Sequence, residues 1–226
     1  MALSDKKILK EKKKGDIVIT PFIAANLNTS SYDVTLGEYY YREQPSKHFH
    51  NIYNIYQKSH TEYVWGKAMK AEKASKVFQK FNFRWDRGIK PNDKIILLQP
   101  GETILAHTRE FIGGRKHITT MMQARSSMGR NFIEVCKCAG WGDVGYINRW
   151  TMEITNNSRY YAIPLVVGRR IAQIVFMETG EILDRHYADD GKYASSSDVK
   201  ILKKKWQPSD MVPKLHKERE IQEKKK

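Results

Sequence analysis

The sequence predicts a mainly β protein, a sandwich or a barrel, and three observations lead to that fold class. From residue 91 onward, short apolar runs rich in Ile, Leu and Val follow one another at close intervals. Turn-forming residues separate these runs, and no helical pattern lies between them, which argues against a βαβ sheet. The length of 226 residues suits one domain whose core needs neither disulfides nor metals.

The first elements are predicted close to the N-terminus. Asp5–Lys14 should form a short helix, because Ser4 can cap its start and Gly15 can end it. Ile17–Thr20 has the composition of a strand, and residues 31–37 alternate as a half-buried strand does.

The stretch 48–90 is irregular and aromatic, and we interpret it as an insert whose one expected element is a helix near 67–79. The strands expected after it cover residues 95–98, 103–106, 118–122, 132–135, 150–154, 161–166 and 170–176.

The charge of the chain is concentrated at its ends. The formal net charge is +15, of which residues 1–14 carry +4 and residues 200–226 carry +6, so the body is close to balanced. We therefore interpret 1–199 as the folded domain and 200–226 as a basic C-terminal tail, solvated or frayed. A nucleic-acid partner is disfavoured, because the body itself has little excess of positive charge.

The sequence also predicts where the protein works. No apolar run approaches the roughly 20 residues of a membrane helix, and no secretory signal follows the charged N-terminus. Cys136 and Cys138 would point to opposite faces of one strand, so no disulfide is expected. We expect a reduced, cytoplasmic protein without a membrane partner.

Four places could carry chemistry. Two of them are residues 168–173, a turn that leads into a strand with a polar Gln173, and residues 191–193 with Tyr187 nearby, in a polar segment that could fold over a ligand. Residues 125–130, R-S-S-M-G-R, bring guanidinium and hydroxyl donors together and would suit an anion, although a polar turn would have the same composition. Glu153 lies among bulky residues in a predicted strand, where a desolvated carboxyl could act as an acid or base, although it could also face solvent.

A zinc site is not expected. His60 and Glu62 match half of the zinc deaminase signature, but the P-C-x-x-C half is absent from the sequence. His48 and His50 also lack cysteines at zinc-finger spacing.

Taken in order, the motifs of residues 3–197 resemble the dCTP deaminase branch of the dUTPase superfamily. The matching blocks are residues 31–37 (S-x-D-x-x-L-G), 100–110, 125–130 (R-S-S-x-x-R), 139–146 (A-G-[aromatic]-x-D), 151–153 (T-x-E), 168–173 (G-x-R-I-x-Q) and 191–193 (G-K-Y). Glu153 distinguishes this branch, since ordinary dUTPases carry an apolar residue there. The resemblance implies a distorted β-barrel that forms a homotrimer with sites between subunits.

The resemblance also implies roles for individual residues. Glu153 would move the protons in a metal-free attack of water on dCTP, with Ser126 and the Ala139 carbonyl holding that water. Arg130 would orient Glu153 and favour its charged form. The implied substrate-binding residues are Arg125, Ser127, Asp143, Thr151, Tyr187, Lys192 and Tyr193, and Mg²⁺ would arrive with the triphosphate.

Some positions depart from the family pattern. Ser196 stands where a glutamine contact to the triphosphate is usual, and Asn148 replaces a glycine. Gly142 replaces an aliphatic residue, which would loosen the loop that carries Asp143.

The first interpretation of function is deamination of dCTP to dUTP and ammonia. The alternative is a two-step enzyme that also cleaves dUTP to dUMP and pyrophosphate, because residues 139–143 resemble the two-step members. On that reading Gly140 would leave room for a second water near Asp143, although Gly140 could simply serve a tight turn. A catalytically silent, nucleotide-binding regulator of the same fold is a further alternative.

Overall fold

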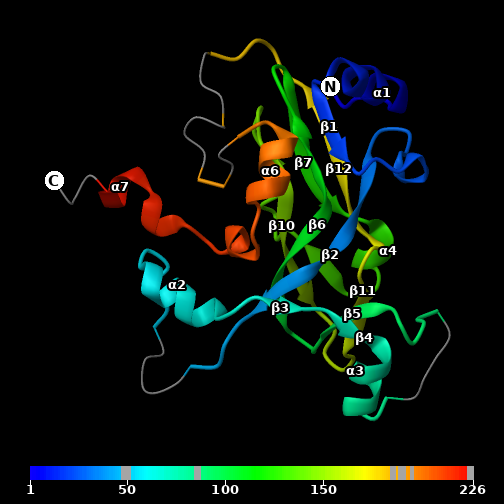
Figure 1. The fold of residues 1–226 in the computed structure, drawn as a ribbon, viewed down its shortest axis with the longest axis vertical. Helices are drawn as coiled ribbons and strands as arrows, with labels where there is room; N and C mark the ends of the chain where they lie inside the picture. Colours follow the sequence, from blue (N-terminus) through cyan, green and yellow to red (C-terminus); the bar gives the residue numbers. More distant parts are fainter. Residues whose placement is uncertain (47–51, 84–87, 184–186, 188–191, 194–195, 223–226) are drawn as a thin grey trace.

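One long, curled sheet forms the body of the protein (Figure 1). The computed structural model describes residues 1–46, 52–83, 88–183, 187, 192–193 and 196–222. Within them, the strand order of this sheet is β8-β10-β6-β2-β12-β7-β9, with β1 added to β6 and β3 to β2. Its strands are β1 (Ile17–Thr20), β2 (Tyr32–Arg42), β3 (Met69–Lys70), β6 (Thr103–Gly114), β7 (Ile118–Ala124), β8 (Ile133–Val135), β9 (Trp141–Gly142), β10 (Ile147–Asn156) and β12 (Arg170–Glu178).

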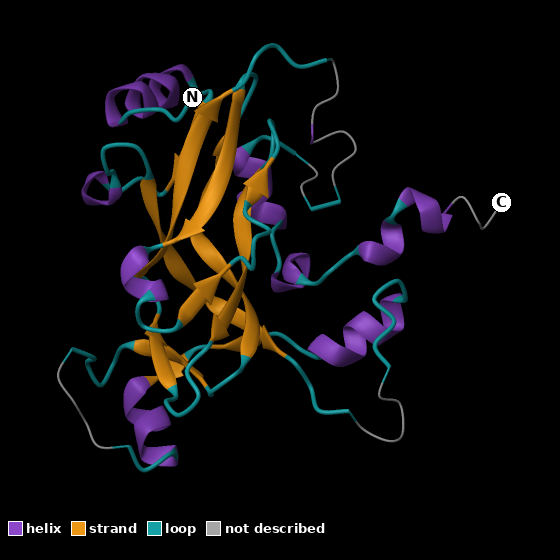
Figure 2. Ribbon diagram, turned by 180° about the vertical axis from the view of Figure 1, so that it is seen from behind, coloured by secondary structure: helices purple, strands orange, loops and turns teal. Residues whose placement is uncertain are grey.

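A smaller sheet lies at one end of the molecule beside α3 (Figure 2). Its strands, in the order β11-β5-β4, are β11 (Ile163–Val166), β5 (Lys94–Leu98) and β4 (Glu72–Lys73). In the described residues the α-helices are α1 (Asp5–Lys14), α2 (Lys58–Trp65), α3 (Ala74–Lys80), α4 (Ser126–Gly129), α6 (Val199–Lys205) and α7 (Arg219–Gln222). Short 3₁₀ turns are η1 (Ala24–Asn26), η2 (Pro208–Met211) and η3 (Leu215–Lys217).

The predicted mainly β fold is confirmed, and so is the first helix. Ser4 accepts a hydrogen bond from the Lys7 N–H, and Gly15 ends α1 with a φ of 87°. The predicted strands are found, although β6 and β10 extend well beyond their apolar runs.

The interpretation of residues 31–37 as half-buried is wrong, because residues 32–37 of β2 are buried on both faces. Their polar groups are paired instead of solvated. Thr35 donates its hydroxyl to Glu110 at 2.7 Å, and Asp33 pairs with Arg170 at 3.0 Å. Buried polar groups keep their hydrogen bonds in this way. A strand that is covered on both faces can therefore still alternate between polar and apolar residues, and this alternation does not reveal its second covered face.

Residues 52–83 and 88–90, the described part of the stretch 48–90, contain more regular structure than expected. Within its described residues α3 overlaps the predicted helix, but α2 was not anticipated. Thr61 is the buried residue of α2, so this helix has no apolar stripe that its sequence could show.

The geometric reason for expecting no disulfide is also corrected. Cys136 and Cys138 do not share a strand but lie in a turn after β8, where both have positive φ. Both thiols are free; Cys136 is buried and Cys138 is exposed.

The C-terminal segment, residues 199–222, is not a frayed end. Leu202 of α6 is buried against Val18 and Phe111, and Met211 is buried against Tyr41 and Leu105. Figure 1 shows this segment in orange and red, with α6 beside β10 and the remainder leading away from the sheet on the side of α2. None of the helices in the described residues is long and apolar enough to span a membrane.

Candidate active site

The site is built where β6 and β10 pair. Glu153 lies opposite Leu105, and Thr151 lies opposite His107. Between Arg149 and Thr151 the register shifts, and the Thr108 hydroxyl accepts the Trp150 N–H at 2.9 Å in place of a regular ladder bond. Such a bulge redirects side chains, and bulges are frequent next to active sites.

Glu153 borders a cavity of about 400 Å³. Six predicted site residues meet around it: Ala139, Asp143, Thr151, Glu153, Tyr187 and Tyr193. They come from β10, from the loops around β9 and from the segment before α6. Residues that are remote in sequence therefore converge on one carboxyl group.

Burial raises the pKa of Glu153, while Lys137 partly opposes this effect. A carboxyl group with a raised pKa can accept a proton and hold it at a pH closer to neutrality. This is the property that proton transfer in a reaction requires.

Asp143 is exposed at the edge of this cavity and accepts a hydrogen bond from the Trp141 indole at 3.2 Å. The loop that carries it is not loosened by Gly142. The Gly142 carbonyl accepts the Thr119 hydroxyl at 2.8 Å, and a Cβ at Gly142 would lie 2.4 Å from Thr120 and Trp150. Glycine is needed there for close packing, so the expected loosening is wrong.

Gly140 has a packing role as well. A Cβ at this position would lie 2.2 Å from the Met122 carbonyl oxygen, and the Met122 N–H donates to the Gly140 carbonyl at 2.7 Å. The missing side chain therefore lets two backbone segments approach, and it does not widen the cavity for a second water.

The R-S-S-M-G-R segment does not border the Glu153 cavity. Ser126, Ser127 and Arg130 are exposed on and after α4, and none of them borders the cavity. The Arg125 guanidinium is paired with Asp33 at 3.2 Å. Within one chain, these four predicted residues are not brought to the carboxyl group.

The C-terminal part of the site is held by the segment that follows it. The Asn148 amide donates to the Tyr193 carbonyl at 2.8 Å, and the Tyr193 hydroxyl accepts the Lys214 N–H at 3.1 Å. Lys192 forms an ion pair with Glu218. Gly191, part of the same motif, lies outside the described residues.

Sequence reasoning missed part of the cavity wall. Met211, Pro213 and Leu215 border it from the C-terminal segment, and Tyr146 packs edge-on against Tyr187 at 5.1 Å. Apolar residues spaced through an otherwise basic tail were the signal that this segment folds back.

The structure offers no zinc centre among the residues that it describes, where no three His, Cys, Asp or Glu side chains gather. His60 instead accepts a hydrogen bond from the Asn54 N–H at 3.2 Å. His48 and His50 lie outside the described residues.

Comparison with known proteins places the chain in context. The model of a family described as dCTP deaminase-like matches residues 2–179. A relative named "dCTP deaminase, dUMP-forming" from Hydrogenobaculum sp. is 32% identical over 186 residues, covering 80% of this chain and 85% of the relative. A protein of the same name from Nanoarchaeum equitans is 28% identical, covering 88% of this chain and 98% of the relative.

A solved structure supports the fold. The crystal structure of 2'-deoxycytidine 5'-triphosphate deaminase from Agrobacterium tumefaciens matches with a TM-score of 0.51 at 17% identity. The match covers 84% of this chain and 52% of that one, so this chain spans about half of its length. At this identity the likeness establishes the architecture alone.

Proposed function

The chain belongs to the dCTP deaminase-like family, and from that premise we propose that it converts dCTP to dUMP, ammonia and pyrophosphate. The observation that carries the proposal is the half-buried Glu153 carboxyl, with its raised pKa, beside Ala139 and Thr151 in one cavity. Relatives named as dUMP-forming favour the two-step reaction over deamination alone, the first interpretation of the sequence.

In the deamination step a water molecule adds to C4 of the cytosine ring. Glu153 takes a proton from that water and delivers it to N3, and the proton of the new 4-hydroxyl group then passes through Glu153 to the amino group. The C4–N bond breaks, ammonia leaves and a carbonyl remains at C4, so that the product is dUTP. The Ala139 carbonyl at the cavity wall can accept a hydrogen bond from the water, and the backbone of Thr151 can read the base.

Ser126 and Arg130 take part, on this proposal, from a neighbouring copy in a homotrimer. Their side chains are exposed and do not border the cavity of their own chain, which supports this arrangement. Arg130 would then orient Glu153 and stabilise its charged form, and Ser126 would help to hold the water. Arg125 and Ser127 of the same segment would contact the triphosphate.

The remaining triphosphate contacts come from Lys192, Tyr193 and Tyr187 on the same chain. Lys192 is paired with Glu218, so the triphosphate must displace the Glu218 carboxylate before it can bind the Lys192 ammonium group. In the second step a water attacks the α-phosphorus and the bond to pyrophosphate breaks. Asp143, at the edge of the cavity, is the carboxylate that can position this water.

The residues of this cavity fit a Mg²⁺ ion that binds together with the triphosphate of the substrate. Among the described residues that border the cavity, the carboxylates are those of Asp143 and Glu153, and Mg²⁺ commonly binds through one or two carboxylates together with substrate phosphates. Asp143 is the residue that would hold the ion, which would supply neutralisation of phosphate charge.

The experiment is incubation of the full chain with each deoxynucleoside triphosphate and Mg²⁺, followed by separation of the products. We expect turnover of dCTP to dUMP, with dUTP also accepted. Absence of any turnover, together with measurable dCTP binding, would instead identify a silent nucleotide-binding regulator.

A further inference from the structure

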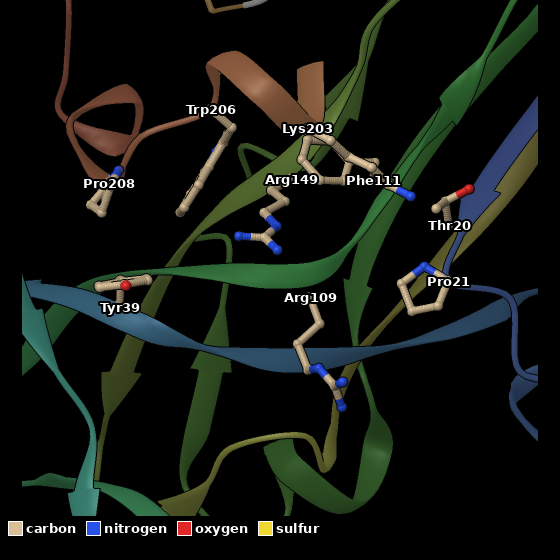
Figure 3. Close-up of a pocket in the computed structure, with 9 residues that line it drawn as sticks. All are labelled: Thr20, Pro21, Tyr39, Arg109, Phe111, Arg149, Lys203, Trp206 and Pro208. Carbon is tan, nitrogen blue, oxygen red and sulfur yellow. The ribbon is translucent and has the colours of Figure 1, made fainter. Parts of the chain in front are cut away.

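A second cavity, of about 440 Å³, lies on the same side of the sheet under the C-terminal segment. Figure 3 shows its walls, which come from β1 and the following Pro21, from β2, β6 and β10, and from Lys203, Trp206 and Pro208. Arg109, Arg149 and Lys203 border it, and among the described residues that line it none is acidic. The cavity therefore gathers positive charge without a counter-charge in its own wall.

Arg149 is the central cation. Its guanidinium lies 5.0 Å from the Phe111 ring and 4.6 Å from the Trp206 ring, so aromatic faces fix its orientation. Its Nε is buried without a hydrogen-bond partner, and the described residues supply no ion pair to it. Figure 3 shows the guanidinium directed into the space between Trp206 and Tyr39.

The carboxylates near Arg149 are committed elsewhere. Glu38 pairs with Lys70 and Lys94, and Glu110 accepts two hydrogen bonds from Thr35. A half-buried guanidinium that has no carboxylate partner among the described residues is costly to keep, unless a ligand supplies the anion. Burial and the charge of Arg109 also lower the pKa of Arg149, although an arginine remains charged.

Two further cations stand at the rim. Lys203 is exposed on α6 and extends toward Thr20 in Figure 3. Arg109 is the exposed residue of an otherwise mostly buried β6, in the stretch where the register of that strand shifts. Arg109 is one of the residues that line the cavity, and Figure 3 shows its guanidinium directed away from Arg149.

We propose that this cavity binds the phosphate groups of a small molecule, a nucleoside polyphosphate or an inorganic polyphosphate. Arg149 would meet a phosphate through its planar donor fork, Lys203 would add a second charge, and the Trp206 ring would offer a stacking surface to a base. Trp206 and Pro208 border the cavity from the C-terminal segment, and its volume suits a small ligand rather than a nucleic-acid strand. The three cations do not border the Glu153 cavity, so the proposal stands independently of deamination.

The test is isothermal titration calorimetry of the full chain with inorganic pyrophosphate and, separately, with ATP. Arg149→Met keeps the apolar stem but removes the donors, and it should weaken binding at this site about tenfold or more. Lys203→Ala, at an exposed position, tests the same site without risk to the core. Tighter binding of ATP than of pyrophosphate, reduced by Trp206→Leu, would identify a nucleotide; equal binding would identify an inorganic polyphosphate.

Two controls make the result decisive. Lys204→Ala removes a neighbouring exposed lysine that does not line the cavity and should leave binding unchanged, and Lys192→Ala should remove only binding at the Glu153 cavity. The proposal fails if Arg149→Met and Lys203→Ala bind both probes as the parent chain does. It also fails if Lys192→Ala abolishes all binding, or if a single-stranded oligonucleotide binds and loses affinity equally with Lys203→Ala and Lys204→Ala.

Discussion

Two cavities share one face of one sheet, yet their chemistry is opposite. Arg149 and Glu153 lie four residues apart on β10. Both side chains are on the opposite face of the strand from Met152, which packs in the core. The Glu153 cavity is walled by Leu105 and apolar residues of the C-terminal segment, which raise the pKa of a carboxyl group. The Arg149 cavity meets Trp206 and two more cations instead.

The difference teaches that the covering segment decides what each part of the face can do. A bare sheet face would leave both charged residues in water, where neither would be perturbed. Residues 206–215 desolvate Glu153 at one end and hold the guanidinium of Arg149 at the other. The following predictions separate the two cavities.

The largest effect is expected from Glu153→Gln, which keeps the shape of the side chain but removes its proton-transfer capacity. Ammonia release from dCTP should fall by roughly 10²–10⁴-fold, with dCTP binding changed only a few-fold. Pyrophosphate binding at the Arg149 cavity should not change. The matched control is Glu134→Gln, a carboxylate of β8 that does not line the cavity, and a comparable rate in Glu153→Gln would refute the assignment.

His107 should affect the stability of the fold and not the reaction rate. Burial lowers its pKa from 6.5 to about 4, and its Nε2 accepts the Tyr39 N–H while Nδ1 lies 2.8 Å from the Thr108 carbonyl, so the folded state holds it neutral. As the pH falls from 6.5 toward 4, the unfolded chain takes up a proton that the folded chain does not. The folded state should therefore lose about 3 kcal/mol over that range.

Urea denaturation at several pH values would measure this loss of unfolding free energy. His107→Asn should flatten the pH dependence by about 1.4 kcal/mol per pH unit. Parallel pH dependence in the variant and the parent chain would show that another group is responsible.

Trp206→Ala tests the covering segment itself. The Trp206 ring packs 4.6 Å from His107 and 6.3 Å from Tyr39, and its half-buried area should contribute about 2 kcal/mol to the unfolding free energy. The dCTP turnover at the Glu153 cavity and the pyrophosphate affinity of the Arg149 cavity should therefore both fall. Lys204→Ala is the control and should leave the denaturation midpoint unchanged. An unchanged midpoint in Trp206→Ala would mean that the C-terminal segment contributes little to stability.

The sequence could predict elements whose signals are local. Ser4 and Gly15 mark α1 through hydrogen bonds to their own neighbours, and the predicted strands follow from runs of β-branched residues. The cluster around Glu153 could be proposed because the resemblance supplied its members in chain order.

The rest depends on long-range packing that local patterns do not carry. Lysines flank Leu202, and Met211 follows the polar residues Ser209 and Asp210, so the hydropathy of the tail hides the residues that anchor it. Gly140 was interpreted as open space, whereas the carbonyl of Met122 occupies that side. Both errors arise because the partner residue is remote in sequence.

The pH dependence of the rate is the smallest expected effect. Because burial raises the pKa of Glu153, turnover should begin to fall at a pH above its ordinary carboxyl value of 4.5. Below the midpoint the rate should drop about tenfold per pH unit, as the base becomes protonated. The rate should be followed by ammonia release, at pH values where circular dichroism shows the fold intact. A midpoint at or below 4.5 would indicate that substrate and neighbouring copies reverse the effect of burial.

The central claim is that one cavity performs both steps on dCTP. Phosphorus NMR of a dCTP reaction, sampled together with an ammonia assay, tests this claim directly. The account predicts pyrophosphate and ammonia in equal amounts from the first time point, without free dUTP. Accumulation of dUTP with no pyrophosphate would contradict it.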